Sequence, residues 1–413
     1  MKTIWIVNYY TAPPQYISNA RHLEFAKHLL SVGYKVRVFS AGYLRDNDID
    51  LVPEDKKYIN VDYDGVPFTH IKVRHYVGNG LNRMLSIMQF AWRLLRLRRH
   101  FEIPDVILHN MHAPFDYPIV LCARKLHARY IAEAWDLWPH YFVTFGLVSA
   151  RNPIMKFAYG IEKRMYQAAS DIVFSFEGGI DYLRERGWTT EGGGKIVPER
   201  VHYINNGIAL KEFYANVEKY YRDDSDLNNN DKFKIVYLGS INLVNNVKKL
   251  IDAAAILQHN SKYSFLIYGN GSDREQLQQY CKKQGINNVI FKEMWIPLEE
   301  VAYVVSQSSL NIMNYQKGFA DYGVSSGKMF QYMAAGKPIL CNIRLNYSEI
   351  CKNNIGIDRD LDTPEAYVEA IEEIANLPVE EYQAMCERAK EAAKQFDYDV
   401  LSEKLIQIIE TNV

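Results

Sequence analysis

Short apolar runs alternate with amphipathic helical patterns along the chain, beginning at the N-terminus. The runs Ile4–Asn8 and Val36–Ser40 predict strands, and the pattern Asn19–Leu30 between them predicts a helix. A strand, a helix and a second strand within about 40 residues indicate a βαβ unit in a parallel sheet. The first loop, Tyr9–Ser18, has no G-x-G-x-x-G motif, which argues against a dinucleotide-binding dehydrogenase.

The same alternation continues through the first half of the chain and begins again in the second. In the first half it predicts strands at His70–Val73, Asp105–His109, Tyr130–Ala134, Asp171–Ser175 and Val201–Ile204. In the second half it predicts strands at Lys234–Leu238, Ser264–Tyr268, Val289–Phe291 and Ser309–Met313. The acidic, polar stretch Leu44–Tyr63 lacks this pattern and is predicted to be a surface excursion. The fold class is therefore α/β, with two doubly wound halves.

A chain of 413 residues is too long for one ordinary core, so two domains are expected. The stretch 217–231 is charged, Asn-rich and without periodicity, which predicts an inter-domain linker. We therefore expect an N-terminal domain at 1–216 and a C-terminal domain at 232–396. The last helical pattern, at 397–413, is expected to pack back on the first domain.

Composition narrows the class of protein. Apolar residues make up 48% of the chain and charged residues 23%, as in soluble globular proteins. The net charge of −1 offers no basic field for nucleic acid. The five cysteines are scattered without a C-x-x-C motif, which favours reduced thiols over a disulfide framework or a zinc site. The first apolar run is too short for a signal peptide or a membrane span, so a cytoplasmic location is expected.

A helical pattern at 81–101 combines arginines with large apolar side chains. A basic amphipathic helix can lie on an anionic membrane surface, which would make the protein peripheral to the inner face of the cell membrane. The commoner alternative is a surface helix whose cationic face is solvated. The arginines concerned are Arg83, Arg93, Arg96, Arg98 and Arg99.

The stretch Asp321–Leu340 predicts a loop, a helix and a strand in quick succession. Ser325 or Ser326 can cap the start of this helix. Lys328 lies in the first turn, three residues before Gln331, so both side chains can reach one ligand. A glycine loop, free backbone N–H groups, the positive end of a helix and a lysine suit a phosphate or diphosphate. The alternative is a plain surface helix.

The strand Tyr130–Ala134 runs into Glu133-Ala-Trp-Asp136-Leu-Trp-Pro-His140, where two carboxylates gather at a strand end. Open α/β sheets place ligand-contacting residues at the carboxyl ends of their strands. Buried acidic residues are rare unless they are paired or functional, so Glu133 and Asp136 are candidate site residues. The alternative is that Asp136 caps the following turn and Glu133 pairs with a nearby arginine.

Together these motifs resemble the family 4 glycosyltransferases, retaining enzymes of the GT-B fold that use nucleotide-sugar donors. The first half carries the resemblance through Glu-x-x-Asp-Leu-Trp-Pro at 133–139 and Asn206-Gly207-Ile208. The second half carries it through Tyr237-Leu-Gly239, Gly269-Asn-Gly271 and Tyr322-Gly-Val-Ser-x-x-Lys-x-Phe-x-Tyr-Met-Ala-Ala-Gly-Lys-Pro338. The combination looks most like the branch that builds bacterial surface polysaccharides such as O-antigen and capsule, including N-acetylfucosamine transferases of O-antigen assembly.

The resemblance implies two Rossmann-like domains facing a cleft, with the donor on the second half and the acceptor on the first. The donor-binding residues that it implies are Gly239, Ser240, Gly269, Trp295, Tyr322, Gly323, Val324, Ser325, Lys328 and Gln331. The catalytic residues predicted from the motifs are Lys328, Asp136 and Glu133. Neither a metal nor a cofactor is expected. The expected partners are a nucleotide sugar, with a UDP-linked N-acetylhexosamine as the family-level expectation, and a saccharide or polyprenyl-linked acceptor.

Four positions depart from the pattern of the family. Ser240 and Asn245 stand where many members have an arginine and a lysine, and Gln331 stands where they have a carboxylate. Trp135 stands where a histidine is frequent. The loss of two cations puts more of the diphosphate charge on Lys328 and on the helix dipole. Two other functions stay open: a non-catalytic GT-B binding subunit and a nucleotide-sugar epimerase.

Overall fold

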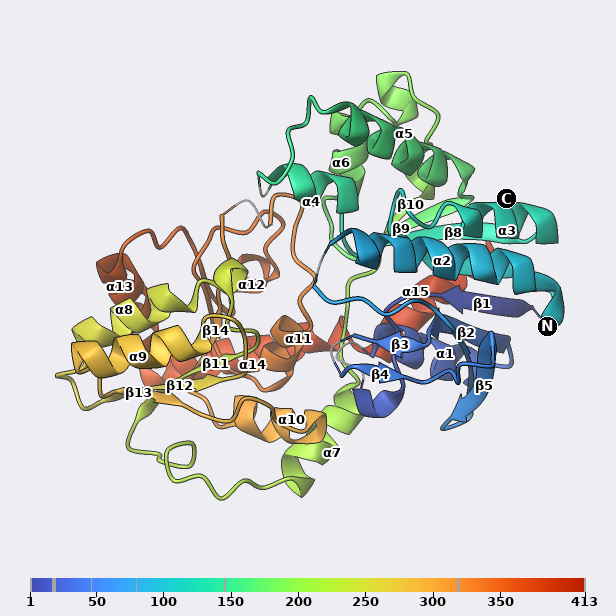
Figure 1. Cartoon of the computed structure of the whole chain (residues 1–413). Helices are drawn as coiled ribbons and strands as arrows, with labels where there is room; N and C mark the ends of the chain where they lie inside the picture. Colours follow the sequence, from blue (N-terminus) through green and yellow to red (C-terminus); the bar gives the residue numbers. More distant parts are fainter. Residues whose placement is uncertain are drawn as a thin grey trace. The chain divides into compact units, whose positions relative to one another are not determined.

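A computed structural model gives the fold and describes residues 2–16, 20–45, 47–78, 80–144, 146–317 and 320–411. Its internal contacts divide the chain into two compact units (Figure 1). Unit 1 comprises Met1–Asn205 together with Tyr398–Val413, and unit 2 comprises Asn206–Asp397. Residues 217–231, which the sequence predicts as a linker, are thus counted within unit 2.

Unit 1 is built on an eight-stranded sheet of order β10-β9-β8-β7-β1-β2-β6-β5. Neighbouring strands are parallel except β5 and β6, which pair antiparallel. The strands are β1 (Thr3–Val7), β2 (Lys35–Ala41), β5 (Tyr58–Tyr63), β6 (Val66–Ile71), β7 (Val106–Asn110), β8 (Arg129–Ala134), β9 (Asp171–Phe174) and β10 (Val201–Tyr203). A separate ribbon pairs β3 (Tyr43–Leu44) with β4 (Ile49–Asp50). Every residue of β1 is buried, because this strand lies between β7 and β2 at the centre of the sheet.

The helices of unit 1 connect these strands and cover their apolar side chains. They are α1 (Arg21–Ser31), α2 (Leu81–Leu97), α3 (Pro118–Leu126), α4 (Trp138–Thr144), α5 (Pro153–Ala168), α6 (Gly179–Glu185) and α15 (Tyr398–Glu410). Helix α15 packs against α1, so the last helix of the chain belongs to the same core as the first. Helices α2 and α3 pack against each other.

Unit 2 is built on a six-stranded parallel sheet of order β13-β12-β11-β14-β15-β16. Its strands are β11 (Phe233–Leu238), β12 (Tyr263–Tyr268), β13 (Val289–Phe291), β14 (Leu310–Met313), β15 (Ile339–Cys341) and β16 (Gly356–Asp358). Its helices are α7 (Leu210–Lys219), α8 (Val247–Leu257), α9 (Arg274–Gln284), α10 (Leu298–Ser306), α11 (Gly327–Ala334), α12 (Glu349–Lys352), α13 (Pro364–Ala375) and α14 (Val379–Lys394). The predicted α/β class with parallel sheets is therefore confirmed.

Two predicted boundaries differ from the structure. The stretch Leu44–Tyr63, predicted to be a surface excursion, contains β4 and also β5, an edge strand of the main sheet whose side chains are only half-buried or exposed. An edge strand with one solvated face needs few apolar residues, so the apolar pattern did not reveal it. The first predicted helix was placed from Asn19, which lies outside the described residues, and α1 begins at Arg21.

Candidate functional site

Two glycine turns meet at one edge of the unit 2 sheet. Gly239 follows β11 and Gly269 follows β12, and these neighbouring parallel strands end at the same edge. Both glycines have a positive φ, +149° at Gly239 and +120° at Gly269. A Cβ at Gly269 would lie 1.9 Å from the carbonyl oxygen of Gly239. The two turns therefore touch backbone to backbone, an approach that a larger residue would prevent.

The amine of Lys328, in the first turn of α11, lies against the Gly239 turn. A Cβ at Gly239 would lie 2.9 Å from Nζ, which is 5.1 Å from the ring centroid of Tyr237 and 6.0 Å from that of Tyr315. Burial lowers the pKa of Lys328 to about 8, opposed by the nearby Cys341 thiol. No carboxylate among the described residues contributes to that pKa. A cation held without a counter-ion beside two glycine turns suits an external anion.

The loop before α11 is tied to the segment that opens unit 2. The backbone N–H of Asn206 donates to Ser325 Oγ at 3.1 Å, and Asn206 Nδ2 donates to the Ser325 carbonyl at 2.8 Å. Ser326 occupies the N-cap position in an extended conformation, but its side chain makes no capping hydrogen bond. The predicted serine cap is therefore wrong. The Ser325 hydroxyl accepts a hydrogen bond from Asn206, and the Ser326 hydroxyl accepts none from the first turn of α11. The Met329 N–H donates to the Ser326 carbonyl at 3.0 Å, and no hydrogen bond from the N–H groups of Gly327 and Lys328 is found within the part of the chain that the structure describes, which suits an anion at this helix start.

The neutral residues at the positions of the missing cations contact each other. Asn245 Nδ2 donates to the Ser240 carbonyl at 2.9 Å, and the hydroxyl of Tyr237 donates to the same carbonyl at 2.6 Å. The side chains of Ser240 and Asn245 therefore add no charge beside Lys328. Gln331 is half-buried one turn further along α11. The sequence prediction that Lys328 carries most of the diphosphate charge stays a prediction, and this arrangement agrees with it.

The remaining predicted donor residues surround this edge of unit 2. Gly323 has a φ of +102° and donates its N–H to the Ala320 carbonyl at 3.1 Å. Tyr322 and Val324 are half-buried, and Val324 packs on the core cluster that contains Met329. Trp295 differs from these residues in its exposure: it lies in the loop that follows β13, and 73% of its surface is exposed.

In unit 1, Glu133 at the end of β8 is completely buried and holds two basic side chains of α1. Arg21 Nε donates to Oε1 at 2.8 Å, and His22 Nε2 lies 2.6 Å from Oε2. Burial alone would raise the pKa of Glu133, but Arg21 and His22 outweigh it and hold the pKa at about 2. The ring of His22 also packs on Trp135, with 4.8 Å between centroids. The expected alternative, pairing of Glu133 with an arginine, is what the structure shows.

Sequence reasoning did not find Arg21 and His22. Both lie on a helix whose pattern shows only that its apolar face is buried, and both are buried polar residues on that helix. The sequence feature that could have indicated a basic partner was Glu133 itself, because a carboxylate at a buried strand end requires a cation or several hydrogen-bond donors. Which cation supplies it depends on the packing of α1, which the sequence pattern does not specify.

Asp136 lies two residues beyond β8 and is in a different environment. Its side chain is exposed, although crowding by the protein raises the pKa of the carboxyl, and His112 and Arg83 oppose this rise. Asp116 fixes His112, with 3.3 Å between Nδ1 and Oδ2, and the same Oδ2 lies 3.0 Å from His109 Nε2. The two candidate carboxylates therefore differ: Glu133 is enclosed and neutralised, whereas Asp136 is open to a ligand and has basic groups nearby.

Helix α2 carries fewer solvated arginines than its sequence indicates. Arg83 Nε donates to the Tyr10 hydroxyl at 2.6 Å, Arg93 donates to the Lys72 carbonyl, and Arg98 donates to the Leu95 carbonyl at 2.6 Å. The exposed side chains of α2 are Leu81, Asn82, Met88, Trp92 and Arg96, and those of the turn Arg98–His100 that follows it are Arg99 and His100. Five of them recur at helical spacing along one stripe: Leu81, Met88, Trp92, Arg96 and Arg99. No helix among the described residues is long and apolar enough to cross a membrane.

Comparison with known proteins agrees with this organisation. Residues 222–396 match the model of the family described as "Glycosyl transferases group 1". This region lies entirely within unit 2 and contains both glycine turns, Lys328 and Trp295. A search of curated proteins found no match.

Solved structures resemble the chain over nearly its whole length. A sucrose-phosphate synthase from Thermosynechococcus elongatus shares 14% identity with a TM-score of 0.71, covering 99% of this chain and 98% of that one. The glycosyltransferase WaaG shares 17% identity with a TM-score of 0.68, covering 99% and 100%. Anabaena Alr3699/HepE, solved with UDP and glucose, shares 12% identity with a TM-score of 0.67, covering 99% of each chain. The protein therefore has the GT-B fold of two Rossmann-like domains.

Proposed function

We propose that the protein is a retaining glycosyltransferase that moves a sugar of the N-acetylhexosamine type from a UDP-linked donor to a saccharide or polyprenyl-linked acceptor. The observation that carries the proposal is the uncompensated Lys328 amine beside the Gly239 and Gly269 turns, at the uncapped start of α11. Support for the nucleotide-sugar class comes from the group 1 match and from HepE, whose structure contains UDP and glucose.

In the proposed reaction the bond between the anomeric carbon and the diphosphate oxygen breaks, and a bond to the acceptor oxygen forms on the same face of the sugar. The proton of the acceptor hydroxyl passes to the departing phosphate oxygen, so no protein nucleophile is required. Lys328 and the first-turn amides of α11 stabilise the charge that grows on the diphosphate, without a protein-bound metal. Asp136 orients the acceptor hydroxyl, and Glu133 is a positioning residue that holds Arg21 and His22.

We propose that this reaction is a step in the synthesis of a surface polysaccharide such as O-antigen or capsule. WaaG, which has the same fold, is described as involved in lipopolysaccharide biosynthesis. Assignment of the chain to family 4, and within it to a branch like the N-acetylfucosamine transferases, rests on the motifs at 133–139 and 322–338.

The donor test uses a panel of UDP, GDP, ADP and UDP-N-acetylglucosamine, with thermal stabilisation and donor consumption as the two readouts. We expect UDP compounds to stabilise the protein, and consumption to require a lipid-linked saccharide acceptor. Stabilisation without consumption at any acceptor would indicate the non-catalytic binding subunit. Conversion of the donor sugar to its epimer without acceptor would indicate the epimerase.

Replacing Asp136 tests the acceptor side of the proposal. We expect Asp136→Asn to lower kcat by about 100-fold, because it removes the carboxylate that orients the acceptor hydroxyl. UDP affinity should not change, because the predicted donor residues lie in unit 2. Asp55→Asn, at another exposed aspartate of unit 1, is the matched control. Near-normal turnover of Asp136→Asn with the true acceptor would show that Asp136 is structural.

The exposed stripe of α2 supports peripheral contact with an anionic membrane on the cytoplasmic side. Trp92 and Met88 are apolar and Arg96 and Arg99 are cationic, which is the combination found at lipid interfaces. We expect the protein to float with phosphatidylglycerol vesicles, and Arg96→Glu with Arg99→Glu to lower the bound fraction severalfold. Arg200→Glu, at an exposed arginine elsewhere in unit 1, serves as the control. Equal flotation of all three proteins would remove the membrane proposal.

A further inference from the structure

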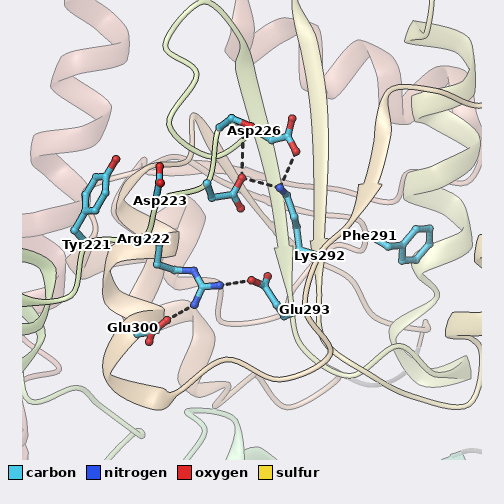
Figure 2. A pocket seen from close by; sticks show the side chains of 10 residues that line it. Tyr221, Arg222, Asp223, Asp226, Phe291, Lys292, Glu293 and Glu300 are labelled. Atoms are coloured by element: carbon cyan, nitrogen blue, oxygen red, sulfur yellow. Dashed lines mark hydrogen bonds and ion pairs between the residues drawn. The ribbon is translucent and has the colours of Figure 1, made fainter.

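A pocket of about 640 Å³ lies within unit 2 beside the loop that follows β13. Figure 2 shows Tyr221, Arg222 and Asp223 on one side of the pocket and Phe291, Lys292 and Glu293 on the other, with Glu300 next to Arg222. Acidic side chains predominate on both walls, and a single arginine and a single lysine, Arg222 and Lys292, lie among them. These two cations form ion pairs that connect the segments lining the pocket.

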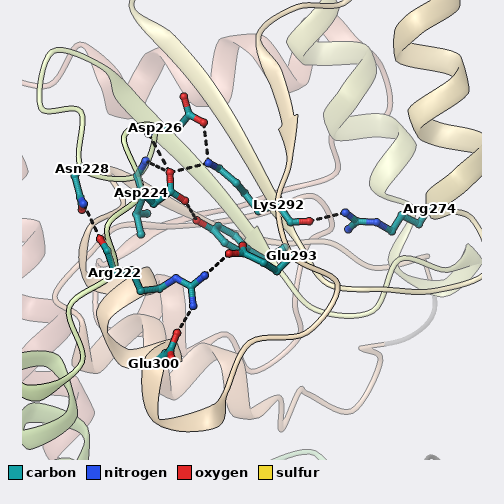
Figure 3. Close-up of polar contacts among 10 residues, drawn as sticks. Arg222, Asp224, Asp226, Asn228, Arg274, Lys292, Glu293 and Glu300 are labelled. Carbon is teal, nitrogen blue, oxygen red and sulfur yellow. Dashed lines mark hydrogen bonds and ion pairs between the residues drawn. The ribbon is translucent and has the colours of Figure 1, made fainter.

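Lys292 makes the first connection. Its Nζ lies 2.7 Å from Asp224 Oδ1 and 2.7 Å from Asp226 Oδ2 (Figure 3). Asp224 Oδ1 also accepts the backbone N–H groups of Asp226 and Leu227 at 3.0 and 3.1 Å, and the Tyr268 hydroxyl donates to Oδ2 at 3.3 Å. The side chains of Lys292 and Asp224 are only 12% and 13% exposed, so water screens this pair weakly. Asp224 therefore both shapes its own turn and anchors the residue at the end of β13.

Arg222 makes the second connection. Its two terminal nitrogens donate to different carboxylates, NH2 to Glu293 Oε1 and NH1 to Glu300 Oε2. Glu293 lies in the loop after β13, and Glu300 lies in the first turn of α10. Because one planar guanidinium holds both acids, Arg222 fixes the start of the loop after β13 relative to the first turn of α10. We refer to the two ion-pair groups, of Arg222 and of Lys292, as the clamp.

The clamped loop is also tied to the Gly269 turn. The Gly269 N–H donates to the Glu293 carbonyl at 3.0 Å, and the Lys292 N–H donates to the Ile267 carbonyl at 2.9 Å. Arg274 donates to the carbonyls of both Gly269 and Lys292. The backbone at 292–293 is thus fixed from both sides, by the clamp and by the turn that belongs to the proposed donor site.

Directly beyond this fixed point, two large apolar side chains are left in solvent. Met294 is 59% exposed and Trp295 is 73% exposed. Adjacent exposed apolar residues on a loop with so many polar anchors indicate a surface that is presented to a ligand. A tryptophan face suits a flat aromatic group, such as the base of a nucleoside diphosphate.

We propose that Arg222 and Asp224 are positioning residues whose clamp presents Trp295 to the base of the nucleotide donor. This inference rests on the proposed function, since it assumes that a nucleoside diphosphate binds at the Gly239 and Gly269 turns. The clamp acts on the base alone, and Lys328 with α11 acts on the diphosphate. The two parts of the ligand therefore depend on different residues of unit 2.

The test compares UDP with inorganic pyrophosphate, which lacks the base, by calorimetric titration of the full chain. We expect Arg222→Gln and Asp224→Asn each to weaken UDP binding about tenfold, the scale of one lost base contact, and to leave pyrophosphate binding unchanged. Arg222→Lys should restore part of the UDP affinity. Arg359→Gln, which removes an arginine–glutamate pair with Glu373 beyond β16, is the matched control and should alter neither.

Three results would overturn the proposal. Unchanged UDP affinity in both clamp variants would show that the clamp does not position the loop. Equal loss of UDP and pyrophosphate binding would show general support of the fold. Trp295→Ala, at an exposed position that folding does not require, must also weaken UDP binding and leave pyrophosphate binding unchanged. Unchanged UDP binding in this variant would overturn the inference even if the clamp variants fail to fold. Wild-type protein that binds pyrophosphate but none of UDP, GDP and ADP would instead overturn the proposed function, and the clamp's role with it.

Discussion

Lys328→Ala is expected to lower the turnover of the donor about 100- to 1000-fold, the usual effect of removing one well-aimed charge from a site that stabilises a leaving group. The effect should be large because no carboxylate among the described residues contributes to the pKa of Lys328, and the side chains of Ser240 and Asn245 carry no charge. Initial rates with a UDP-linked donor measure it. Lys394→Ala, at an exposed lysine of α14, is the control and should turn over normally.

The same residue predicts a pH dependence of UDP binding. Burial lowers the pKa of Lys328 to about 8 in the free protein, and a lysine is charged below its pKa. Between about pH 7, where the terminal phosphate of UDP is fully ionised, and about pH 8, UDP affinity should be constant. It should fall above about pH 8, because a growing fraction of the protein must first take up a proton to attract the diphosphate. Lys328→Met should abolish this fall. A normal rate in Lys328→Ala, or a flat affinity profile up to pH 9.5 in the wild type, would show that α11 has been misinterpreted.

Glu133→Gln is expected to destabilise the protein by about 3–5 kcal/mol, because it removes the charge of the carboxylate that pairs with the fully buried Arg21. At about 2–4 °C per kcal/mol, the unfolding transition of unit 1 should drop by roughly 6–20 °C. Scanning calorimetry measures this drop. Glu191→Gln breaks the exposed pair with Arg184 and should leave the transition where it is.

Acid should reduce the difference between the wild type and Glu133→Gln. The pKa of Glu133 is held at about 2, below its ordinary 4.5, so its ionised form stabilises the fold at any pH above 4.5. This stabilisation is lost as the pH falls from 4.5 toward 2, because the carboxylate takes up a proton and releases Arg21 and His22. An unfolding transition that is the same in both proteins at pH 7 would contradict a structural role for Glu133.

The fold could be predicted largely because the central strands of both sheets are parallel and buried. Strands such as β1 and β11 contain apolar runs, Ile4–Val7 and Ile235–Leu238, and amphipathic helices separate the strands, so the order of elements is visible in the sequence. The edge strand β5 was missed because Tyr58, Asn60 and Asp62 show the composition of a loop. Its pairing with β6 comes from backbone hydrogen bonds, to which the side-chain pattern contributes little.

The candidate site could be predicted only where local sequence determines it. The glycine turns and the lysine at the start of α11 are visible because conformation and charge there depend on neighbouring residues. The contact of Arg21 with Glu133 joins residues 112 positions apart, which no local pattern encodes. The stretch 217–231 resembles a linker because its anchors are ionic: Arg222 and Asp224 find their partners about 70 residues later.

The return of α15 to unit 1 has a consequence for the order in which the protein folds during synthesis. Unit 2 is one continuous segment, 206–397, whereas unit 1 needs residues 398–410 to complete its core with Tyr398, Leu401, Leu405 and Ile409. Domains made first usually fold first. Here all of unit 2 is synthesised before α15, the helix that packs against α1. Unit 1 therefore exposes part of its apolar surface until α15 has been synthesised. A chain halted before residue 398 would therefore be a substrate for chaperones even though its second unit is complete.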